Sequence, residues 1–186
     1  FVLKCVGNPK DEKELYYNII GPFFNKVFGF SPEMRLYDSN TTFGFTVYSK
    51  ALFEFLTNQI GLCDGRKENL LGLPPIFKKN KKYLTPLIRG IFDTDGCISF
   101  KKKYQSKPYY PVISLSLNSK SLVIEISQFL KELEFKVVEI YDYKVIDLRT
   151  EKGFTVINRL ELNGKDNLRK WIAKVGFLSP KHLDKI

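Results

Sequence analysis

Two aspartates and a glycine close an apolar stretch of the sequence. The stretch Leu87–Phe100 reads LIRGIFDTDGCISF, so Asp93 and Asp95 come just before Gly96. Its pattern predicts a helix that ends at the acids and runs into a strand, with Gly96 favouring a left-handed helix end. Carboxylates are unfavourable there, because the helix dipole is negative at its C-terminus. A divalent cation such as Mg²⁺ would offset the repulsion, which indicates metal-assisted phosphate chemistry.

Composition narrows the range of chemistries. The 186 residues carry a net charge of +10, and 44% of them are hydrophobic, which is enough to bury a core. The excess of Lys and Arg favours a polyanionic partner such as nucleic acid, the alternative being a basic protein with solvated lysines. With one histidine, His182, and three cysteines without paired spacing, a zinc site, a histidine base and a catalytic triad are not expected.

The cysteine usage also fits a reducing compartment, either a prokaryotic cytoplasm or an organelle matrix. No apolar run is long enough to span a bilayer, so no membrane partner is expected.

The order of predicted elements repeats once along the chain, which predicts an α+β fold of two pseudo-symmetric half-domains. The first half is predicted to contain a helix at 11–28, strands at 33–38 and 42–48, and a helix at 50–61. The second half is predicted to contain strands at 111–118, 136–148 and 153–162, and helices at 120–133 and 165–175. The expected boundaries are 1–62 for the N-terminal half, 63–80 for a linker and 81–186 for the C-terminal half.

The predicted strands alternate between apolar and polar residues. Ile113 and Leu115 would face a core, while Ser114 and Ser116 would lie on the opposite face. An ordinary solvated sheet face explains any one strand. Repetition across the strands, together with the positive charge, favours sheets that bind DNA. The candidate DNA-binding residues are Lys4, Ser99, Lys101, Lys103, Gln105, Ser114, Ser116, Asn118 and Arg159.

The segment Ile88–Gly96, IRGIFDTDG, resembles the LAGLIDADG motif of homing endonucleases. Apolar residues fill the other helical positions except for Arg89, and the matching residues are Gly90, Asp93, Asp95 and Gly96. The order of elements and the ending Val175–Leu183 are similar to those of archaeal members encoded in introns or inteins. The resemblance implies a mixed α/β fold whose antiparallel sheets form a DNA-binding saddle.

The resemblance also implies a mechanism. Asp95, assisted by the backbone around Gly96, would hold Mg²⁺ or Mn²⁺, with Ca²⁺ expected to bind without supporting cleavage. Lys120 would lie near the attacking water, the alternative being a solvated lysine at a helix start. Gly90 and Asp93 would be structural. The implied function is site-specific hydrolysis of double-stranded DNA.

Two rival functions are weighed against cleavage. One is a non-cleaving nucleic-acid binder, such as a maturase of intron RNA or a degenerate endonuclease. The other is a basic scaffold protein, which would leave Asp93 and Asp95 unexplained.

The family uses two motif helices, and the sequence contains one Asp-x-Asp-Gly end. By the repeat offset, roughly 25 residues of a first motif helix and strand are absent. The second helix is therefore expected from a preceding segment outside this sequence or from a second copy of the chain. It would cover the helix flank formed by Leu84, Leu87 and Ile91 around Gly90, since soluble proteins avoid large exposed apolar patches.

Overall fold

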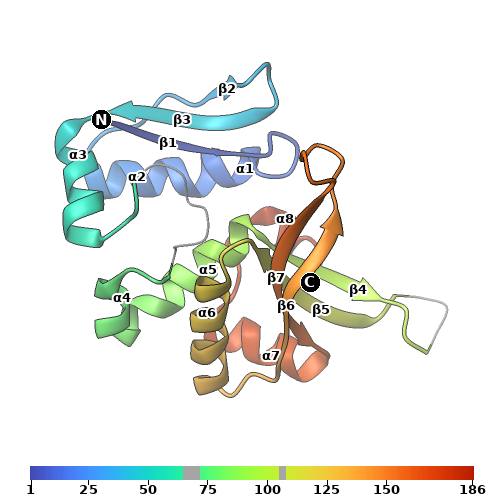
Figure 1. The fold of residues 1–186 in the computed structure, drawn as a ribbon. Helices are drawn as coiled ribbons and strands as arrows, with labels where there is room; N and C mark the ends of the chain where they lie inside the picture. Colours follow the sequence, from blue (N-terminus) through green and yellow to red (C-terminus); the bar gives the residue numbers. More distant parts are fainter. Residues whose placement is uncertain (65–71, 105–107) are drawn as a thin grey trace. The chain divides into compact units, whose positions relative to one another are not determined.

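The structure is a computed structural model that describes residues 1–64, 72–104 and 108–186. The chain divides into two compact units, Phe1–Leu62 with Phe177–Ile186, and Cys63–Gly176. This division differs from the boundaries expected from the sequence, because the last ten residues group with the N-terminal half. Figure 1 labels the elements of both units.

The first unit contains a three-stranded antiparallel sheet of order β1-β3-β2. Its strands are β1 (Val2–Gly7), β2 (Arg35–Tyr37) and β3 (Thr42–Tyr48). Its helices are α1 (Lys13–Leu15), α2 (Gly21–Phe28), α3 (Lys50–Glu54) and α8 (Pro180–Leu183), with π-helical turns at Tyr16–Ile20 and Phe55–Ile60. Helices α1 and α2 run alongside the sheet (Figure 1).

The core of the first unit consists of aromatic and aliphatic side chains that alternate along β3. Phe43, Phe45 and Val47 are buried together with Gly44, whereas Thr42 and Thr46 on the other face are more exposed. The ring of Phe24 on α2 lies 5.0 Å from that of Phe45. The alternation expected for this strand is confirmed.

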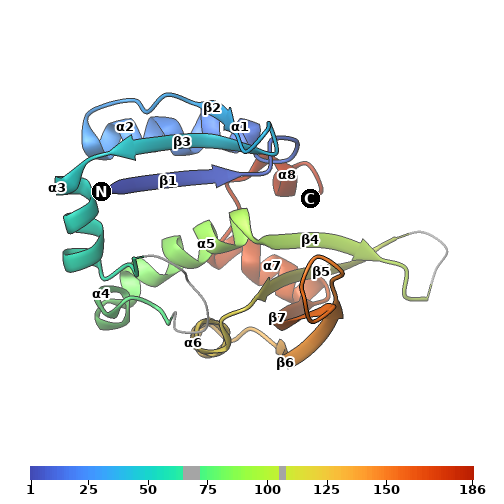
Figure 2. The same ribbon diagram turned by 45° about the horizontal axis from the view of Figure 1, so that its top comes forward.

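The second unit contains a four-stranded antiparallel sheet of order β4-β5-β7-β6. Its strands are β4 (Gly96–Lys101), β5 (Tyr110–Leu117), β6 (Val137–Ile146) and β7 (Phe154–Asn163). Its helices are α4 (Pro75–Lys79), α5 (Leu84–Thr94), α6 (Lys120–Glu132) and α7 (Lys165–Lys174), with a 3₁₀ turn at Lys81–Tyr83. Helix α5 leads directly into β4 (Figure 2).

Helices cover the apolar face of this second sheet. Helix α6 contacts β6 and β7, and α7 contacts β5 and β7. Trp171 of α7 is fully buried, with its ring 4.5 Å from that of Phe92 on α5. Ile98, Ile113 and Leu160 complete the core from the strands.

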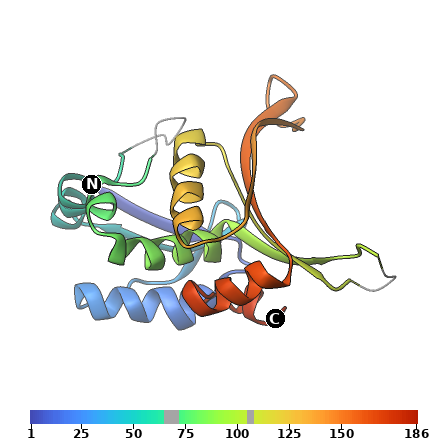
Figure 3. The same cartoon turned by 90° about the horizontal axis from the view of Figure 1, so that it is seen from below.

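In two places this unit departs from the pattern of its sequence. The linker predicted at 63–80 contains α4 in its described part, and Leu73 is buried with its N–H bonded to the carboxylate of Glu125. Val156 shares the apolar parity of Leu160 but is exposed. The reason is that β5 pairs with β7 only as far as Asn158, so Val156 lies where β6 is its only partner strand. Figure 3 shows this hairpin extending beyond the helices.

Candidate active site

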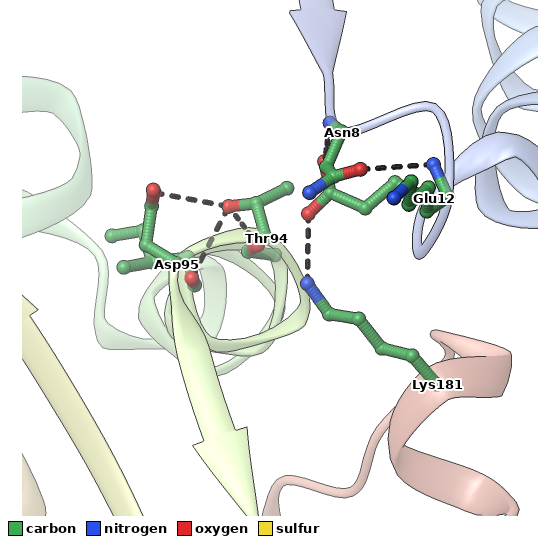
Figure 4. A network of polar contacts seen from close by, with 8 residues as sticks. Asn8, Glu12, Thr94, Asp95 and Lys181 are labelled. Atoms are coloured by element: carbon green, nitrogen blue, oxygen red, sulfur yellow. Dashed lines mark hydrogen bonds and ion pairs between the residues drawn. The ribbon is translucent and has the colours of Figure 1, made fainter. Parts of the chain in front are cut away.

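The acids of the Asp-x-Asp-Gly run have opposite environments at the end of α5. Asp93 is 3% exposed, whereas the carboxylate of Asp95 is exposed to solvent. The N–H of Asp95 donates to the carbonyl of Ile91 at 2.9 Å, which makes Asp95 the last residue held by the helix. Thr94 Oγ1 lies 3.1 Å from Asp95 Oδ2 and 3.1 Å from the carbonyl of Gly90 (Figure 4).

Gly96 is required for a different reason from the one expected. The φ angle of Gly96 is not positive, and Asp95 before it has the right-handed helical conformation. The predicted left-handed helix end is therefore wrong. A Cβ at position 96 would lie 2.5 Å from the carbonyl oxygen of Phe92 and 2.9 Å from its Cα. The chain therefore needs glycine here because the start of β4 passes close to the last turn of α5.

The carboxylate of Asp95 has the properties of one ligand in a metal site. An exposed carboxylate at the negative end of a helix is a hard oxygen donor that a cation would stabilise. Mg²⁺ commonly takes one or two carboxylates and fills its other positions with water and phosphate. Among the described residues there is no group of three or more His, Cys, Asp or Glu side chains that could hold a metal. The motif helix itself ends in one exposed acid, Asp95.

The flank of α5 expected to pack against a second motif helix is only partly exposed in this chain. Leu84 is 5% exposed and belongs to the buried face with Ile88 and Phe92, so that part of the prediction is wrong. Leu87 and Ile91 are half-buried. Gly90 is exposed, and a Cβ there would meet nothing within 4 Å.

Arg89, the polar residue within the motif helix, has a structural role. Its Nε donates to the carbonyl of Val175 at 2.6 Å, just past the end of α7. A cation at a helix C-terminus satisfies free carbonyls and the helix dipole. Arg89 thereby fastens α7 to the motif helix.

Lys120 begins α6 and pairs with an acid from β6. Its Nζ forms an ion pair with Asp142 Oδ2 and lies 5.6 Å from the ring centroid of Tyr141. Its catalytic role stays a prediction. The acid partner, 22 positions away, was missed from the sequence.

Two neighbouring side chains on β6 have strongly shifted pKa values. Glu139 accepts from Lys131 at 2.8 Å, from Ser127 at 2.5 Å and from the hydroxyl of Tyr141 at 2.9 Å. These partners, with Lys131 foremost, lower the pKa of Glu139 to about 2. Burial, followed by the bond to Glu139, raises the pKa of Tyr141 to about 12. Tyr141 therefore stays neutral beside Lys120 at physiological pH.

The strand register places the predicted binding residues of the second unit on one sheet face. Cross-strand pairs align Cys97 with Ser114, Ser114 with Glu161, and Ser116 with Arg159. Arg159 Nε donates to Ser116 Oγ at 3.0 Å, and Lys101 Nζ lies 3.8 Å from Glu161 across β5. Glu161 is an acid on this face that lies among the candidate DNA-binding residues.

The remaining predicted binding residues lie at the margins of the sheets. Lys103 lies 4.3 Å from the ring of Tyr110, and Asn118 follows β5 with its side chain exposed. Gln105 lies outside the described residues. In the first unit, Lys4 pairs with Asp38 at 3.0 Å.

Arg35 is a second cation of the first sheet that the sequence reading missed. Its guanidinium lies 4.8 Å from the ring of Tyr37, which Lys4 also approaches at 5.1 Å. An Arg and an aromatic residue two positions apart on one strand would have signalled this pair, since they share a face.

A motif helix that ends in an exposed acid and continues into a polar antiparallel sheet is the arrangement of a LAGLIDADG-like domain. The family model with that description matches residues 83–176, just over half of the chain. The chain belongs to the LAGLIDADG homing endonuclease family.

Solved structures show the same mixed α/β fold. A variant of the homing endonuclease I-DmoI, bound to its target DNA in the presence of magnesium, superposes with a TM-score of 0.56 at 17% identity. I-DmoI with DNA and manganese also gives a TM-score of 0.56, at 16% identity. The comparisons cover 94% of this chain and 78% and 79% of those chains.

A curated relative is much longer than this chain. The DNA-directed RNA polymerase subunit Rpo1C of Methanocaldococcus jannaschii is 31% identical over an alignment of 115 residues, and the match covers 57% of this chain and 12% of that protein. The chain thus spans about an eighth of its length. Among the described residues, no helix has the length and apolar character needed to cross a bilayer.

Proposed function

We propose that the chain is the DNA-cleaving part of a site-specific endonuclease that hydrolyses double-stranded DNA with a divalent metal. The observation that supports this most directly is the exposed carboxylate of Asp95 at the end of the motif helix, where the chain turns into the polar sheet face. The I-DmoI structures, which contain target DNA with magnesium or manganese, support the same substrate and cofactor.

Each part of the site has a separate task. Asp95, with backbone carbonyls at the end of α5, would hold Mg²⁺ or Mn²⁺, which lowers the pKa of bound water and stabilises the leaving oxygen. Lys120 would hold and orient a water near the scissile phosphate. Lys101, Arg159 and the serines of β4 and β5 would contact phosphates and base edges. A second acid, from a further motif helix, would complete the site.

The test compares Asp95→Asn with Asp166→Asn, which removes another exposed acid, on α7. The full protein that carries the chain is incubated with a library of random duplexes and Mg²⁺, and cut sequences are recovered. Asp95→Asn should abolish cutting and keep duplex binding in Ca²⁺, whereas Asp166→Asn should cut normally. Cutting by Asp95→Asn at the normal rate would overturn the assignment.

A non-cleaving binder is the second candidate function, favoured because no group of three or more His, Cys, Asp or Glu side chains that could hold a metal is found among the described residues. It predicts duplex or intron-RNA binding that is indifferent to Asp95→Asn and no cut product from the unmodified protein. Competition between the selected duplex and a structured RNA of equal length distinguishes these two ligands.

We also propose that the chain belongs to an intein. The match to part of a polymerase subunit supports an endonuclease translated within a host protein rather than from a free-standing intron gene. Expression of the complete reading frame tests this, because an intein yields an excised protein and a joined host protein. A single unspliced product from the native host would contradict the proposal.

A further inference from the structure

Strand β6 contains a bulge beside Lys120. The register pairs Ile140 with Arg159 and then Tyr143 with Ile157, so Tyr141 and Asp142 together face Asn158 alone. Asp142 has φ of +55°, a left-handed conformation that Asn and Asp tolerate better than other side chains. Bulges of this kind redirect a side chain and are common beside active sites.

Asn158 holds the bulge in place. It is 2% exposed, its Oδ1 accepts from the N–H of Asp142 at 3.1 Å, and its Nδ2 donates to the carbonyl of Asn118 at 3.0 Å. One partner is a backbone donor and the other a backbone acceptor, so the side chain at 158 must supply both an acceptor and a donor. An amide meets that requirement, whereas a carboxylate or an aliphatic group does not.

The two bonds of Asn158 end on the two segments that carry the ion pair. Asn118 precedes Ser119, the N-cap of α6, and Lys120 is the first residue of that helix. Asp142 supplies the carboxylate that pairs with Lys120 Nζ. A lysine at a helix N-terminus is repelled by the helix dipole, so without an acid partner its ammonium would not be held at this position.

We infer that Asp142 and Asn158 are positioning residues for Lys120, Asp142 by fixing its ammonium and Asn158 by fixing the bulge and the start of α6. This inference rests on the proposed function, in which Lys120 acts near the scissile phosphate. The inference explains why β6 contains a bulge that interrupts its hydrogen bonds to β7. It also explains why a buried position on β7 has an amide side chain.

The first experiment measures single-turnover cleavage and DNA affinity for Asp142→Asn. Asparagine tolerates the left-handed conformation, so the bulge is kept and only the carboxylate is lost. Removing a negative charge should leave DNA affinity unchanged or tighter, since the partner is a polyanion. The cleavage rate at saturating DNA should fall about 10- to 100-fold, because a misplaced group forfeits its orientation.

Two controls make this result specific. Asp142→Glu keeps a carboxylate and should recover part of the rate, and Asp166→Asn makes the same charge change on α7 and should leave the rate unchanged. If Asp142 were a plain surface charge, Asp142→Asn would tighten binding and keep the full cleavage rate, which would overturn the inference.

The second experiment needs no cleavage. The side-chain ammonium and Cε resonances of Lys120 are followed by NMR in the unmodified protein, Asp142→Asn, Asn158→Asp and Asn158→Ala. All three variants should move the Lys120 signals, and both Asn158 variants should also speed amide exchange at Asp142. Unchanged Lys120 signals in Asn158→Ala would overturn the inference. Absence of cleavage in the unmodified protein would instead refute the proposed function.

Discussion

Lys181 Nζ donates to Glu12 Oε1 at 2.7 Å, which joins residues 169 positions apart within the first unit (Figure 4). The other oxygen of Glu12 accepts from the N–H of Asn8 at 2.8 Å. The side chains are only 19% and 10% exposed, so the carboxylate depends on these two donors.

We predict that Lys181→Met destabilises the first unit by about 3 kcal/mol, because it leaves a buried carboxylate without its cation. Lys26→Met, which changes an exposed lysine of α2, should alter the unfolding free energy by less than about 0.5 kcal/mol. Urea unfolding followed by the aromatic signals of this unit measures both. Equal stabilities for the two variants would show that the pair contributes nothing.

The two glycines of the motif should respond oppositely to alanine. Gly96→Ala should cost about 2 kcal/mol, because its Cβ would collide with the backbone of Phe92. Gly90→Ala should stabilise the isolated chain by about 1 kcal/mol, since its Cβ meets nothing within 4 Å and alanine is the better helix former. Thermal unfolding checks both signs. If a second motif helix packs closely at Gly90, the same alanine should weaken that assembly, which sedimentation would detect.

Lys101→Ala should weaken duplex binding and lower the slope of log K against log salt concentration by about 1, as expected when one phosphate contact is lost. Lys174→Ala removes a lysine of α7 that pairs with Glu134, and it should leave the slope unchanged. Fluorescence anisotropy over a salt series measures the slope. A slope equal to that of the unmodified protein for Lys101→Ala would remove this residue from the interface.

The lowered pKa of Glu139 predicts that the stability of the fold depends on pH in the acid range. Its pKa is about 2 in the folded protein against 4.5 ordinarily, so its pairing with Lys131 stabilises the fold above about pH 4.5. That contribution is lost as pH falls through the folded value. Glu139→Gln should therefore be less stable than the unmodified protein at pH 6, with the difference shrinking towards pH 2. Denaturant unfolding across this range should show converging curves, and a constant gap would contradict the assignment.

The elements that the sequence predicted best are those in which local pattern and core burial agree. Strand Thr42–Tyr48 matches its prediction because Phe43, Phe45 and Val47 are buried, as its apolar alternation predicts. Helix α6 begins at Lys120 because the hydroxyl of Ser119 accepts a bond from the N–H of Leu122. The sequence did not show why position 96 requires glycine. A glycine before a strand allows either a left-handed turn or a close approach between two backbone segments.

The candidate site was predictable only where its residues adjoin in sequence. The Asp-x-Asp-Gly run locates Asp95 by itself, whereas the pairing of Lys120 with Asp142 depends on a bulge that no local pattern signals. The bulge depends in turn on the amide of Asn158, which reads in the sequence as one more polar strand residue. Such contacts follow from strand register, which single residues do not specify.

The division of the chain into two units also determines the order in which the residues of each unit are synthesised. The first unit contains residues from both ends of the sequence, and the second lies entirely between them. Domains usually fold from the N-terminus onward during synthesis. The ion pair of Glu12 with Lys181, however, cannot form until Lys181 has been synthesised. The aromatic core around Phe45 takes its buried residues from positions 16–52, so within this unit it is the ion pair of Glu12 with Lys181 that forms only after Phe177–Ile186 have been made.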